Sequence, residues 1–375
     1  MVVRNLKEII YGKINSNNKK AIVIMGARQV GKTTMLRSMF ENDETAMYLN
    51  GDEYDVQNIF ANPSSDYLKQ IFGNKKNIII DEAQRIENIG LKLKLITDNI
   101  PEIQLFVSGS SSLDLANKIN EPLTGRKWEY MMYPVSFGEM VNYHGLLTEK
   151  RLIPHRVICG YYPEVVMNGG NEKEILKLLT DSYLYKDIFN WEEIKKPDKL
   201  QKLLQALAYQ IGSQVSFSEL AQICGLDVKT IERYILLLEQ CFVIFRLGSF
   251  SRNLRNELKF SKKIYFYDNG VRNSLIANFT PSTNRQDIGA LWENFLVSER
   301  KKKMAYAQIW HNSWFWRTNE QKEIDYIEET DGILKAFEFK WSENTKYKVP
   351  KAFSNSYPDT AVDLITPSNI EKFLL

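Results

Sequence analysis

AIVIMGARQVGKTTML, residues 21–36, is the stretch that decides the fold of the N-terminal part of the chain. Its core, GARQVGKT, sets Gly26, Gly31, Lys32 and Thr33 at the spacing of a phosphate-binding loop. The aliphatic residues before this core predict a buried strand, and the residues after it favour a helix. A strand, a glycine-containing loop and a helix N-terminus in this order turn backbone N–H groups towards phosphate oxygens. The stretch therefore predicts a nucleoside-triphosphate site.

The chemistry expected at this loop follows from its residue types. Lys32 would neutralise the β- and γ-phosphates, and the Thr33 hydroxyl would ligate Mg²⁺. The alternative is an ordinary glycine-containing turn between a strand and a helix, and both flanking elements argue against it. We therefore expect ATP and Mg²⁺ as cofactors. The expected nucleotide-binding residues are Gly26, Ala27, Arg28, Gln29, Val30, Gly31, Lys32, Thr33 and Thr34.

The composition limits the class of protein. With 375 residues, 44% hydrophobic and 25% charged, the chain is long enough for two or three domains with sizeable cores. No apolar run approaches about 18 residues, which excludes a membrane-spanning helix, and the N-terminus lacks the features of a signal peptide. Three scattered cysteines predict neither a disulfide framework nor a zinc cluster. We expect a cytoplasmic protein whose net charge of +3 does not by itself indicate nucleic-acid binding.

Short aliphatic runs alternate with longer mixed segments as far as residue 145, which is typical of a parallel sheet with crossover helices. The third run ends in IIIDEAQ, so Asp81 and Glu82 should lie at the carboxyl edge of the sheet, where open α/β folds bind ligands. Asp81 then suits a contact with Mg²⁺-bound water, and Glu82 suits polarisation of the water that attacks the γ-phosphate. The runs are residues 21–25, 46–49, 77–80 and 103–108, with a fifth candidate at 128–133.

Two further features near this sheet leave alternatives open. The fourth run ends in FVSGSSS, where Ser108 or Ser110 would either read the γ-phosphate or cap the next helix. TGRKWEY then presents Arg126. This arginine would act as a catalytic finger, in its own subunit or from a neighbour in an oligomer, or it would be a surface ion-pair partner.

The segment after residue 200 predicts a winged helix-turn-helix, preceded by helices and by a linker at KKPDK. In SFSELAQICGLDVKTIERYILLLEQCFVIFRL, Ser216 or Ser218 caps one helix, Gly225 makes a turn, and residues 228–240 carry an apolar helical stripe. Residues 243–247 then read as a strand. This order of elements is that of a winged helix.

The partner of this predicted winged helix is left open by the sequence. Its second helix would offer Asp227, Lys229, Thr230 and Arg233, to the major groove if the partner is double-stranded DNA. The same helix carries acidic residues, and a protein partner is the alternative. Nearby basic residues would supply phosphate contacts or form a solvated face. They are Arg252, Arg255, Lys259, Lys262 and Lys263.

EIDYIEETDGILKAFEFKW reads as two strands joined by a two-residue turn at Asp-Gly. Such a turn fixes the register, so Asp325 should face Glu338, with Lys340 on the same face and Glu323 opposite it. Phe337 and the aromatic residues on either side of Lys340 should then point into a core. Two opposed carboxylates repel unless a cation lies between them, and a divalent metal ion is the natural candidate.

Six motifs, in this order, carry a resemblance to a known family: GARQVGKTT, IIIDEAQ, VSGSSS, LTGR, PVSFGEM and GYYPEVV. With them the chain resembles, over essentially its whole length, the bacterial and archaeal AAA-type ATPases that end in a restriction-endonuclease-like domain. The resemblance implies an ATPase core in which Lys32, Thr33, Asp81 and Glu82 have the roles given above. The biological task of this family is poorly defined, so the resemblance adds little beyond the core.

Asp325, Glu338 and Lys340 match the Asp…Glu-x-Lys arrangement of restriction-like nucleases, whose carboxylates hold Mg²⁺ and whose lysine activates water or steadies phosphate charge. Glu293, in the helical-looking segment ALWENFLVSE, resembles the extra acidic residue on the first helix of that fold. This makes Glu293, Asp325 and Glu338 the expected metal ligands and Lys340 an expected catalytic residue. The alternative is a charged outer strand in which Lys340 pairs with Glu323 and bridges towards Glu338 without a metal.

Together these features predict an α/β protein with a P-loop AAA-type parallel sheet, a helical lid, a winged helix-turn-helix and a restriction-endonuclease-like domain. The first hypothesis for function is an ATP-hydrolysing machine coupled to Mg²⁺-dependent cleavage or remodelling of DNA. The second is a nucleotide-gated switch that engages a protein partner, and the third is a passive DNA-binding platform, both with an inert C-terminal site. The expected domains are 1–145, 146–199, 200–250 and 251–375.

Overall fold

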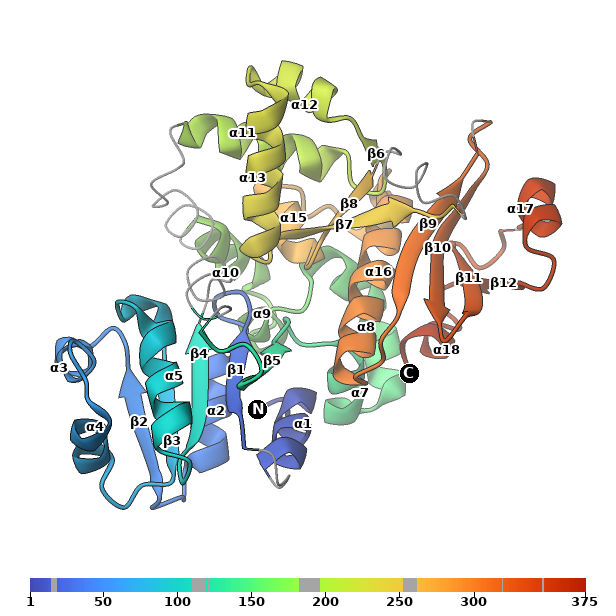
Figure 1. The fold of residues 1–375 in the computed structure, drawn as a ribbon. Coiled ribbons are helices and arrows are strands. Elements are labelled where there is room, and N and C mark those ends of the chain that lie inside the picture. Colours follow the sequence, from blue (N-terminus) through green and yellow to red (C-terminus); the bar gives the residue numbers. More distant parts are fainter. Residues whose placement is uncertain are drawn as a thin grey trace. The chain divides into compact units, whose positions relative to one another are not determined.

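The computed structural model describes residues 1–375 apart from 15–18, 110–118, 120–121, 182–195, 252–261, 319 and 346. The chain forms two compact units (Figure 1). The first unit holds residues 1–134 and 240–242, and the second holds residues 135–239 and 243–375. Each unit is built around its own β-sheet.

A five-stranded parallel sheet forms the centre of the first unit. Its strands are β1 (Ala21–Met25), β2 (Ala46–Asn50), β3 (Asn77–Asp81), β4 (Gln104–Gly109) and β5 (Lys127–Met131). They lie in the order β2-β3-β4-β1-β5, and every neighbouring pair is parallel. Their aliphatic side chains make β1 and β4 fully buried, as expected for strands covered on both faces. The predicted α/β fold with a parallel sheet is confirmed.

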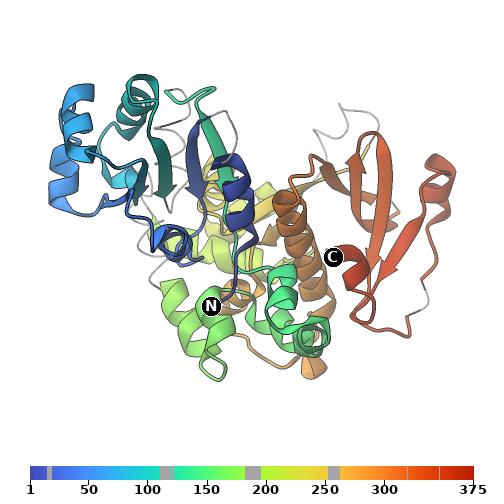
Figure 2. The same cartoon turned by 90° about the horizontal axis from the view of Figure 1, so that it is seen from below.

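Helices connect these strands and cover the sheet, as two perpendicular views show (Figure 1 and Figure 2). The helix that follows the phosphate-binding loop begins directly after Gly31. The hydroxyl of Ser64 caps another helix by accepting a hydrogen bond from Tyr67 N at 3.1 Å. The helices are α1 (Asn5–Ile14), α2 (Lys32–Phe40), α3 (Tyr54–Ile59), α4 (Ser65–Phe72), η1 (Ala83–Arg85) and α5 (Ile89–Asn99).

The second unit contains a seven-stranded mixed sheet. Its strands are β6 (Gln214–Val215), β7 (Ile244–Ser249), β8 (Lys262–Phe266), β9 (Asn312–Arg317), β10 (Glu323–Thr330), β11 (Ile333–Phe339) and β12 (Val362–Ile365). They lie in the order β12-β11-β10-β9-β7-β8-β6. β7 pairs in parallel with β9, with Gly248 opposite Trp314. The sheet therefore continues across the boundary expected between residues 250 and 251, and this boundary does not separate two sheets.

Helices make up the rest of the regular structure described in this unit. They are α7 (Phe137–His144), α8 (Leu146–Cys159), α9 (Pro163–Met167), α10 (Glu172–Leu179), α11 (Pro197–Tyr209), α12 (Phe217–Cys224), α13 (Val228–Gln240), α15 (Asn269–Leu275), η3 (Ser282–Asn284), α16 (Ile288–Tyr306), α17 (Lys351–Ser356) and α18 (Glu371–Leu374). In the part of the chain that the structure describes, none of the helices has the length and apolar character that crossing a membrane requires.

The elements α11, β6, α12, α13, β7 and β8 follow one another in the order expected for a winged helix-turn-helix. Ser216 is the residue that caps α12, because its hydroxyl accepts a hydrogen bond from Glu219 N at 3.3 Å. Gly225 ends α12 in the left-handed region, at a φ of 63°. β8 lies between β6 and β7 and runs antiparallel to both. The assignment as a winged helix stays a prediction from this order.

Aromatic side chains fill the core of the second unit. Phe373 of α18 packs against Phe337 and Phe339 of β11 and against Tyr326 of β10, with ring centroids 4.7, 5.3 and 5.8 Å apart respectively. Phe337 and Phe339 are each 5% exposed. The alternate face of the predicted hairpin thus points into a core, as its pattern indicated.

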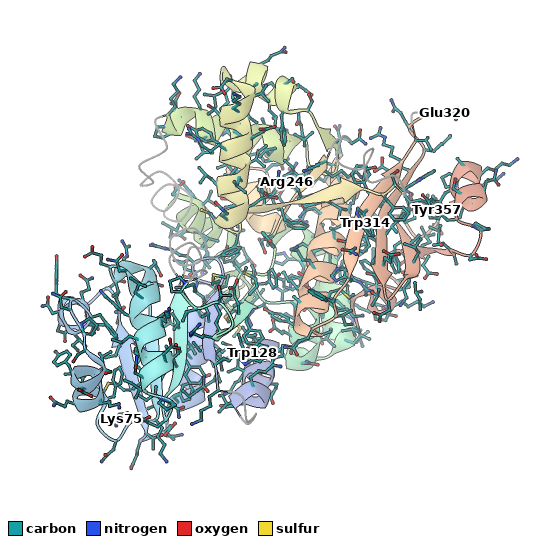
Figure 3. The ribbon with its side chains drawn as sticks, viewed as in Figure 1. Lys75, Trp128, Arg246, Trp314, Glu320 and Tyr357 are labelled. Carbon is teal, nitrogen blue, oxygen red and sulfur yellow. The ribbon has the colours of Figure 1, made fainter. Side chains whose placement is uncertain are left out.

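A second aromatic cluster lies beside β9, where Figure 3 labels Trp314 and Tyr357. The ring of Phe250 lies 5.0 Å from that of Trp314 and 5.3 Å from that of Tyr357. Trp316 and Phe353 complete the cluster with an edge-on contact. Phe250 directly follows β7, so this packing holds the pairing of β7 and β9 in place.

Candidate nucleotide site and C-terminal acidic cluster

The phosphate-binding loop lies between β1 and α2, at the carboxyl edge of the sheet. Gly26 is required by close packing, since a Cβ atom there would lie 2.1 Å from Met132 O. Gly31 and Gln29 both adopt the left-handed region, with φ of 96° and 59°. Val30 is fully buried beneath the loop. The loop therefore has a fixed, tightly packed shape that a larger residue at position 26 would change.

Lys32 lies inside the loop rather than in solvent, with 5% of its surface exposed. Its Nζ donates hydrogen bonds to Gly26 O at 2.8 Å and to Ala27 O at 2.7 Å. A phosphate group bound by the loop would offer the same ammonium a stronger, charged acceptor. Lys32 is thus held within the loop, and its contact with the phosphates stays a prediction.

Arg4 of the segment before α1 supports the loop from behind. Its guanidinium donates to Val30 O at 2.5 Å and to Tyr133 O at 2.6 Å, and the side chain is 7% exposed. It therefore ties the loop to the segment after β5. The sequence carries no local signal for this role, because Arg4 lies 26 residues before one of its partners and 129 before the other.

Asp81 is the best-connected carboxylate of this site. Thr33 Oγ1 donates to its Oδ2 at 2.6 Å, Tyr48 donates to the same oxygen, and Ser108 donates to Oδ1 together with the N–H of Glu82. Burial by itself would raise the pKa of Asp81, but the hydrogen bonds from Ser108, Thr33 and Tyr48 outweigh it and hold the pKa below its usual range. Asp81 is therefore an ionised acceptor beside Thr33, as a Mg²⁺ site requires.

Tyr48 of β2 is the residue of this group that the sequence did not reveal. Burial raises its pKa, and its hydrogen bond to Asp81 adds to this effect, so the phenol stays a donor. It reaches Asp81 because β2 and β3 are neighbours in register, with Tyr48 opposite Ile79. Register between strands joined by a long crossover is not readable from one sequence.

Glu82 follows β3 in the left-handed region, at a φ of 49°. Its Oε2 accepts a hydrogen bond from Gln84 Nε2 at 2.6 Å. Gly51 packs against its backbone so closely that a Cβ atom at position 51 would lie 2.5 Å from Glu82 O. A non-glycine residue held in this region costs about 1–3 kcal/mol, which is typical of residues at functional sites. Glu82 is thus set directly beside Asp81 by a fixed turn.

Ser108 is fully buried on β4, between β3 and β1, and its hydroxyl donates to Asp81. Ser110 lies outside the described residues. That either serine reads the γ-phosphate stays a prediction. The structure adds a positioning role for Ser108, because its hydroxyl orients the carboxylate of Asp81.

Arg126 lies at the opposite edge of the sheet. It precedes β5, whose first residue, Lys127, stands opposite Ala21, the first residue of β1. The five residues of β1 span roughly 16 Å, which separates Arg126 from the phosphate-binding loop. Its Nε donates to Asp98 Oδ1 at 2.5 Å. The prediction of a finger within its own subunit is therefore wrong, and a role in a neighbouring subunit stays a prediction.

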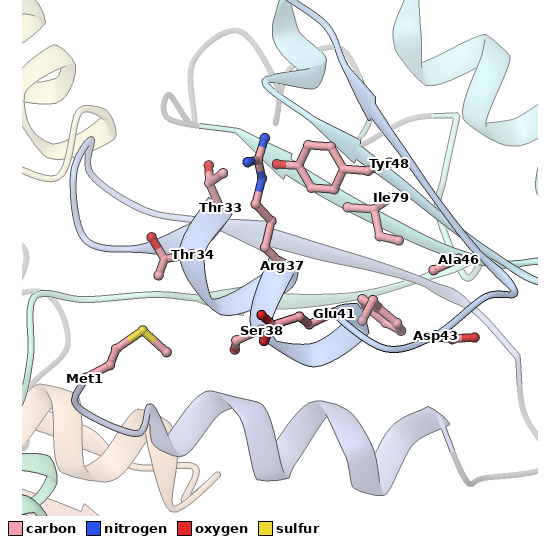
Figure 4. A pocket seen from close by; sticks show the side chains of 11 residues that line it. Met1, Thr33, Thr34, Arg37, Ser38, Glu41, Asp43, Ala46, Tyr48 and Ile79 are labelled. Carbon is pink, nitrogen blue, oxygen red and sulfur yellow. The ribbon is translucent and has the colours of Figure 1, made fainter.

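A pocket of about 720 Å³ adjoins this site along α2 (Figure 4). Thr33 and Thr34 line it near the loop, and Arg37 extends from α2 towards the ring of Tyr48. The guanidinium carbon of Arg37 lies 4.8 Å from the centre of that ring. The pocket therefore gives solvent access to the side of the site that holds Thr33 and Tyr48.

The C-terminal hairpin has the predicted register. Thr330 pairs with Ile333, and the pairing continues to Tyr326 opposite Phe337. A β-bulge on the β9 side, between Ile324 and Ile327, was not predicted. At the bulge, two residues of β10 lie opposite one residue of β9. Such bulges change the direction in which side chains point.

Asp325 lies in this bulge. Its Oδ2 accepts a hydrogen bond from Phe339 N at 2.8 Å. Burial and then repulsion from Glu293 and Glu338 raise its pKa well above the usual range. Burial also raises the pKa of Glu338 against the hydrogen bond from Lys340, whose Nζ lies 2.6 Å from Glu338 Oε1. The structure thus brings Glu293, Asp325, Glu338 and Lys340 into one acidic cluster.

Lys263 of β8 occupies the middle of this cluster. Its Nζ donates to Glu293 Oε1 at 2.7 Å and forms an ion pair with Glu323, while only 2% of the side chain is exposed. Glu323 is also 3.5 Å from Arg317. The alternative pairing of Lys340 with Glu323 is absent among the described contacts, and Lys263 is buried rather than part of a surface basic cluster. Lys263 thus supplies a positive charge to two carboxylates of the cluster, and the binding of a metal ion by Glu293, Asp325 and Glu338 stays a prediction.

Residues 18–141 match the family model of an AAA domain. This part of the chain belongs to the AAA-type P-loop ATPases. The match spans the phosphate-binding loop, Asp81 and all five strands of the first sheet. Residues 150–283 and 288–370 match models of two domains of unknown function.

The relatives extend the likeness beyond the AAA domain. An uncharacterised protein of Methanocaldococcus jannaschii is 23% identical over 369 residues, which cover 92% of this chain and 80% of the relative. An uncharacterised protein of Haemophilus influenzae is 25% identical over 343 residues, which cover 83% of this chain and 80% of the relative. Among solved structures, the Walker-type ATPase of Pyrococcus abyssi has a TM-score of 0.51 at 15% identity and covers 74% of this chain and 96% of its own. This last likeness is one of fold.

Proposed function

We propose that this chain binds ATP with Mg²⁺ at the AAA domain and hydrolyses it. The observation that carries this proposal is the direct contact between Thr33 and Asp81, with Lys32 inside the adjoining loop. These residues come from two neighbouring motifs 48 positions apart, and they meet at one edge of the sheet. Together they supply a hydroxyl and a carboxylate for Mg²⁺ and an ammonium for the phosphates.

The proposed roles follow from where each group lies. Lys32 would exchange its loop carbonyls for the β- and γ-phosphate oxygens, and Thr33 would ligate Mg²⁺. Asp81 would hold a Mg²⁺-bound water, since four donors already fix its carboxylate. Glu82 would orient the attacking water from the turn after β3.

Two substitutions test this proposal in the full chain. Lys32→Ala should abolish ATP binding, whereas Glu82→Gln should keep binding and lower turnover at least about 100-fold, the lower end of the range for a general base. ATP binding is measured by fluorescence of a labelled nucleotide and turnover by phosphate release. Lys69→Ala on α4 and Glu87→Gln are matched controls, because both side chains are exposed and outside the site. Unaltered hydrolysis in Lys32→Ala and Glu82→Gln would contradict the assignment.

A second candidate function is Mg²⁺-dependent DNA cleavage by the C-terminal cluster. It is supported by the meeting of Asp325, Glu338 and Lys340 with Glu293, as in the Asp…Glu-x-Lys pattern. The Lys263 ammonium in the same cluster opposes it. Incubation of the protein with supercoiled plasmid, ATP and Mg²⁺ or Mn²⁺ tests this candidate. Nicking that is lost in Asp325→Ala and Lys340→Ala supports it, and nicking that survives both substitutions, or no nicking, rejects this site.

Association with DNA is proposed through the predicted winged helix. Lys229 and Arg233 are exposed on α13 and are free to face a phosphate backbone, whereas Asp227 is used as the cap of α13, accepting from Thr230 N at 2.9 Å. Arg252, Arg255 and Lys259 lie outside the described residues. Stimulation of the ATPase by double-stranded DNA in the plasmid experiment supports this role. Absence of stimulation favours the alternative, a nucleotide-gated switch that engages a protein partner.

A further inference from the structure

Lys263 is a buried cation paired with two carboxylates of the acidic cluster. It extends from β8 into the cluster formed by α16 and β10, and only 2% of its side chain is exposed. Tyr265, two residues along the same strand, also donates to Glu293 Oε1, at 2.6 Å. The strand β8 thus supplies both a charge and a hydroxyl to one carboxylate.

The carboxylates around Lys263 have the spacing of a metal site. One oxygen each from Glu293, Glu323 and Asp325 lies within 4.8 Å of the others, and these three form such a group among the residues that the structure describes. Carboxylate oxygens at this spacing suit a divalent cation. A buried ammonium group can equally stabilise such carboxylates, because buried like charges require a positive partner of some kind. Lys263 contacts two of the three directly.

We propose that Lys263 is the resident cation of this cluster: its ammonium takes the place of a divalent ion between Glu293, Glu323 and Asp325, and removal of its charge opens a divalent-metal site. The proposal is independent of the second candidate function and opposes it, since cleavage at this cluster would first require Lys263 to leave. Arg317, 3.5 Å from Glu323, adds a further positive charge on the outer side. In the natural chain, basic side chains therefore offset the negative charge of the cluster.

The test uses the full chain without nucleotide and Mn²⁺ alone as the probe, with free Mn²⁺ counted by electron paramagnetic resonance. Lys263→Met keeps the length of the side chain and removes its charge, and Lys263→Arg keeps the charge. Lys263→Met should bind one more Mn²⁺ ion than the natural chain. The affinity of this new site should be at least tenfold higher than that of any Mn²⁺ site in the natural chain. Lys263→Arg should match the natural chain. Adding Asp325→Asn to Lys263→Met should remove the new site.

A second measurement keeps the proposal falsifiable if Lys263→Met does not fold. Asp325→Asn and Glu323→Gln, made in the natural chain, should leave Mn²⁺ binding unchanged, because Lys263 already supplies the positive charge at these residues. Where Lys263→Met does fold, its thermal midpoint should fall in EDTA and recover with Mn²⁺. The proposal is overturned if the natural chain binds an ion that Asp325→Asn removes, or if Lys263→Met gains none.

The plasmid assay separates this proposal from the nuclease candidate. If Lys263→Met binds Mn²⁺ and does not nick DNA, the role of Lys263 stands and the nuclease candidate fails. If the natural chain nicks DNA through Asp325 and binds Mn²⁺ there, the nuclease candidate stands and the role of Lys263 fails. Nicking by Lys263→Met alone supports the role of Lys263 and rejects DNA cleavage by the natural chain.

Discussion

At the scale of single residues, the nucleotide site depends on how one carboxylate is held. Asp81 accepts hydrogen bonds from Thr33, Tyr48, Ser108 and the N–H of Glu82. Because these bonds favour the charged carboxylate, Asp81 contributes stability that is present above its unfolded pKa and is lost as the pH falls through its lower folded pKa. The motif predicted Asp81 itself, but three of its four donors come from other elements.

Tyr48→Phe tests this arrangement without removing a recognised motif residue. The substitution removes one donor to a charged acceptor, which costs about 1.5–3 kcal/mol of the free energy of unfolding. We expect the Mg²⁺ concentration for half-maximal ATPase activity to rise several-fold, because Asp81 loses part of its orientation. Chemical denaturation and a Mg²⁺ titration of turnover measure the two effects. Tyr54→Phe is the matched control, since Tyr54 is 83% exposed, and equal behaviour of both variants would contradict this role.

At the scale of elements, the sequence predicted those features that local pattern determines. The five strands of the AAA domain follow their aliphatic runs, and the hairpin register follows from the two-residue turn before Ile333. The bulge that holds Asp325 and the parallel pairing of β7 with β9 were not predicted, because each depends on a strand distant in the chain. The same reason explains why Lys263 was placed on the surface.

The phosphate-binding loop offers a prediction at this scale. Gly26→Ala should displace the whole loop, because its Cβ atom would lie 2.1 Å from the backbone oxygen of Met132. Such overpacking costs about 1–3 kcal/mol of the free energy of unfolding. We also expect ATP affinity to fall by tenfold or more. Gly12→Ala on α1 is the control, since nothing lies within 4 Å of its Cβ position and alanine favours helices. Normal nucleotide binding by Gly26→Ala would show that the loop adapts.

At the scale of the whole molecule, the sequence predicted the presence and the fold class of the AAA domain. It did not predict how the residues after this domain divide into compact units. Four domains were expected, with a boundary at 250/251. The structure has two compact units, and one sheet carries strands from both sides of that boundary. Composition and linker signals show where a chain can turn, but pairing between strands decides what folds together.

The position of Lys263 has a consequence for inheritance. Lys263 belongs to the stretch 150–283 and its carboxylate partners to the stretch 288–370, the two ranges that match separate domains of unknown function. A gene rearrangement that passed on the later stretch by itself would leave β9 as a bare edge and Glu293 without its ammonium partner. We therefore expect the two ranges to occur together, within one gene, wherever either is found.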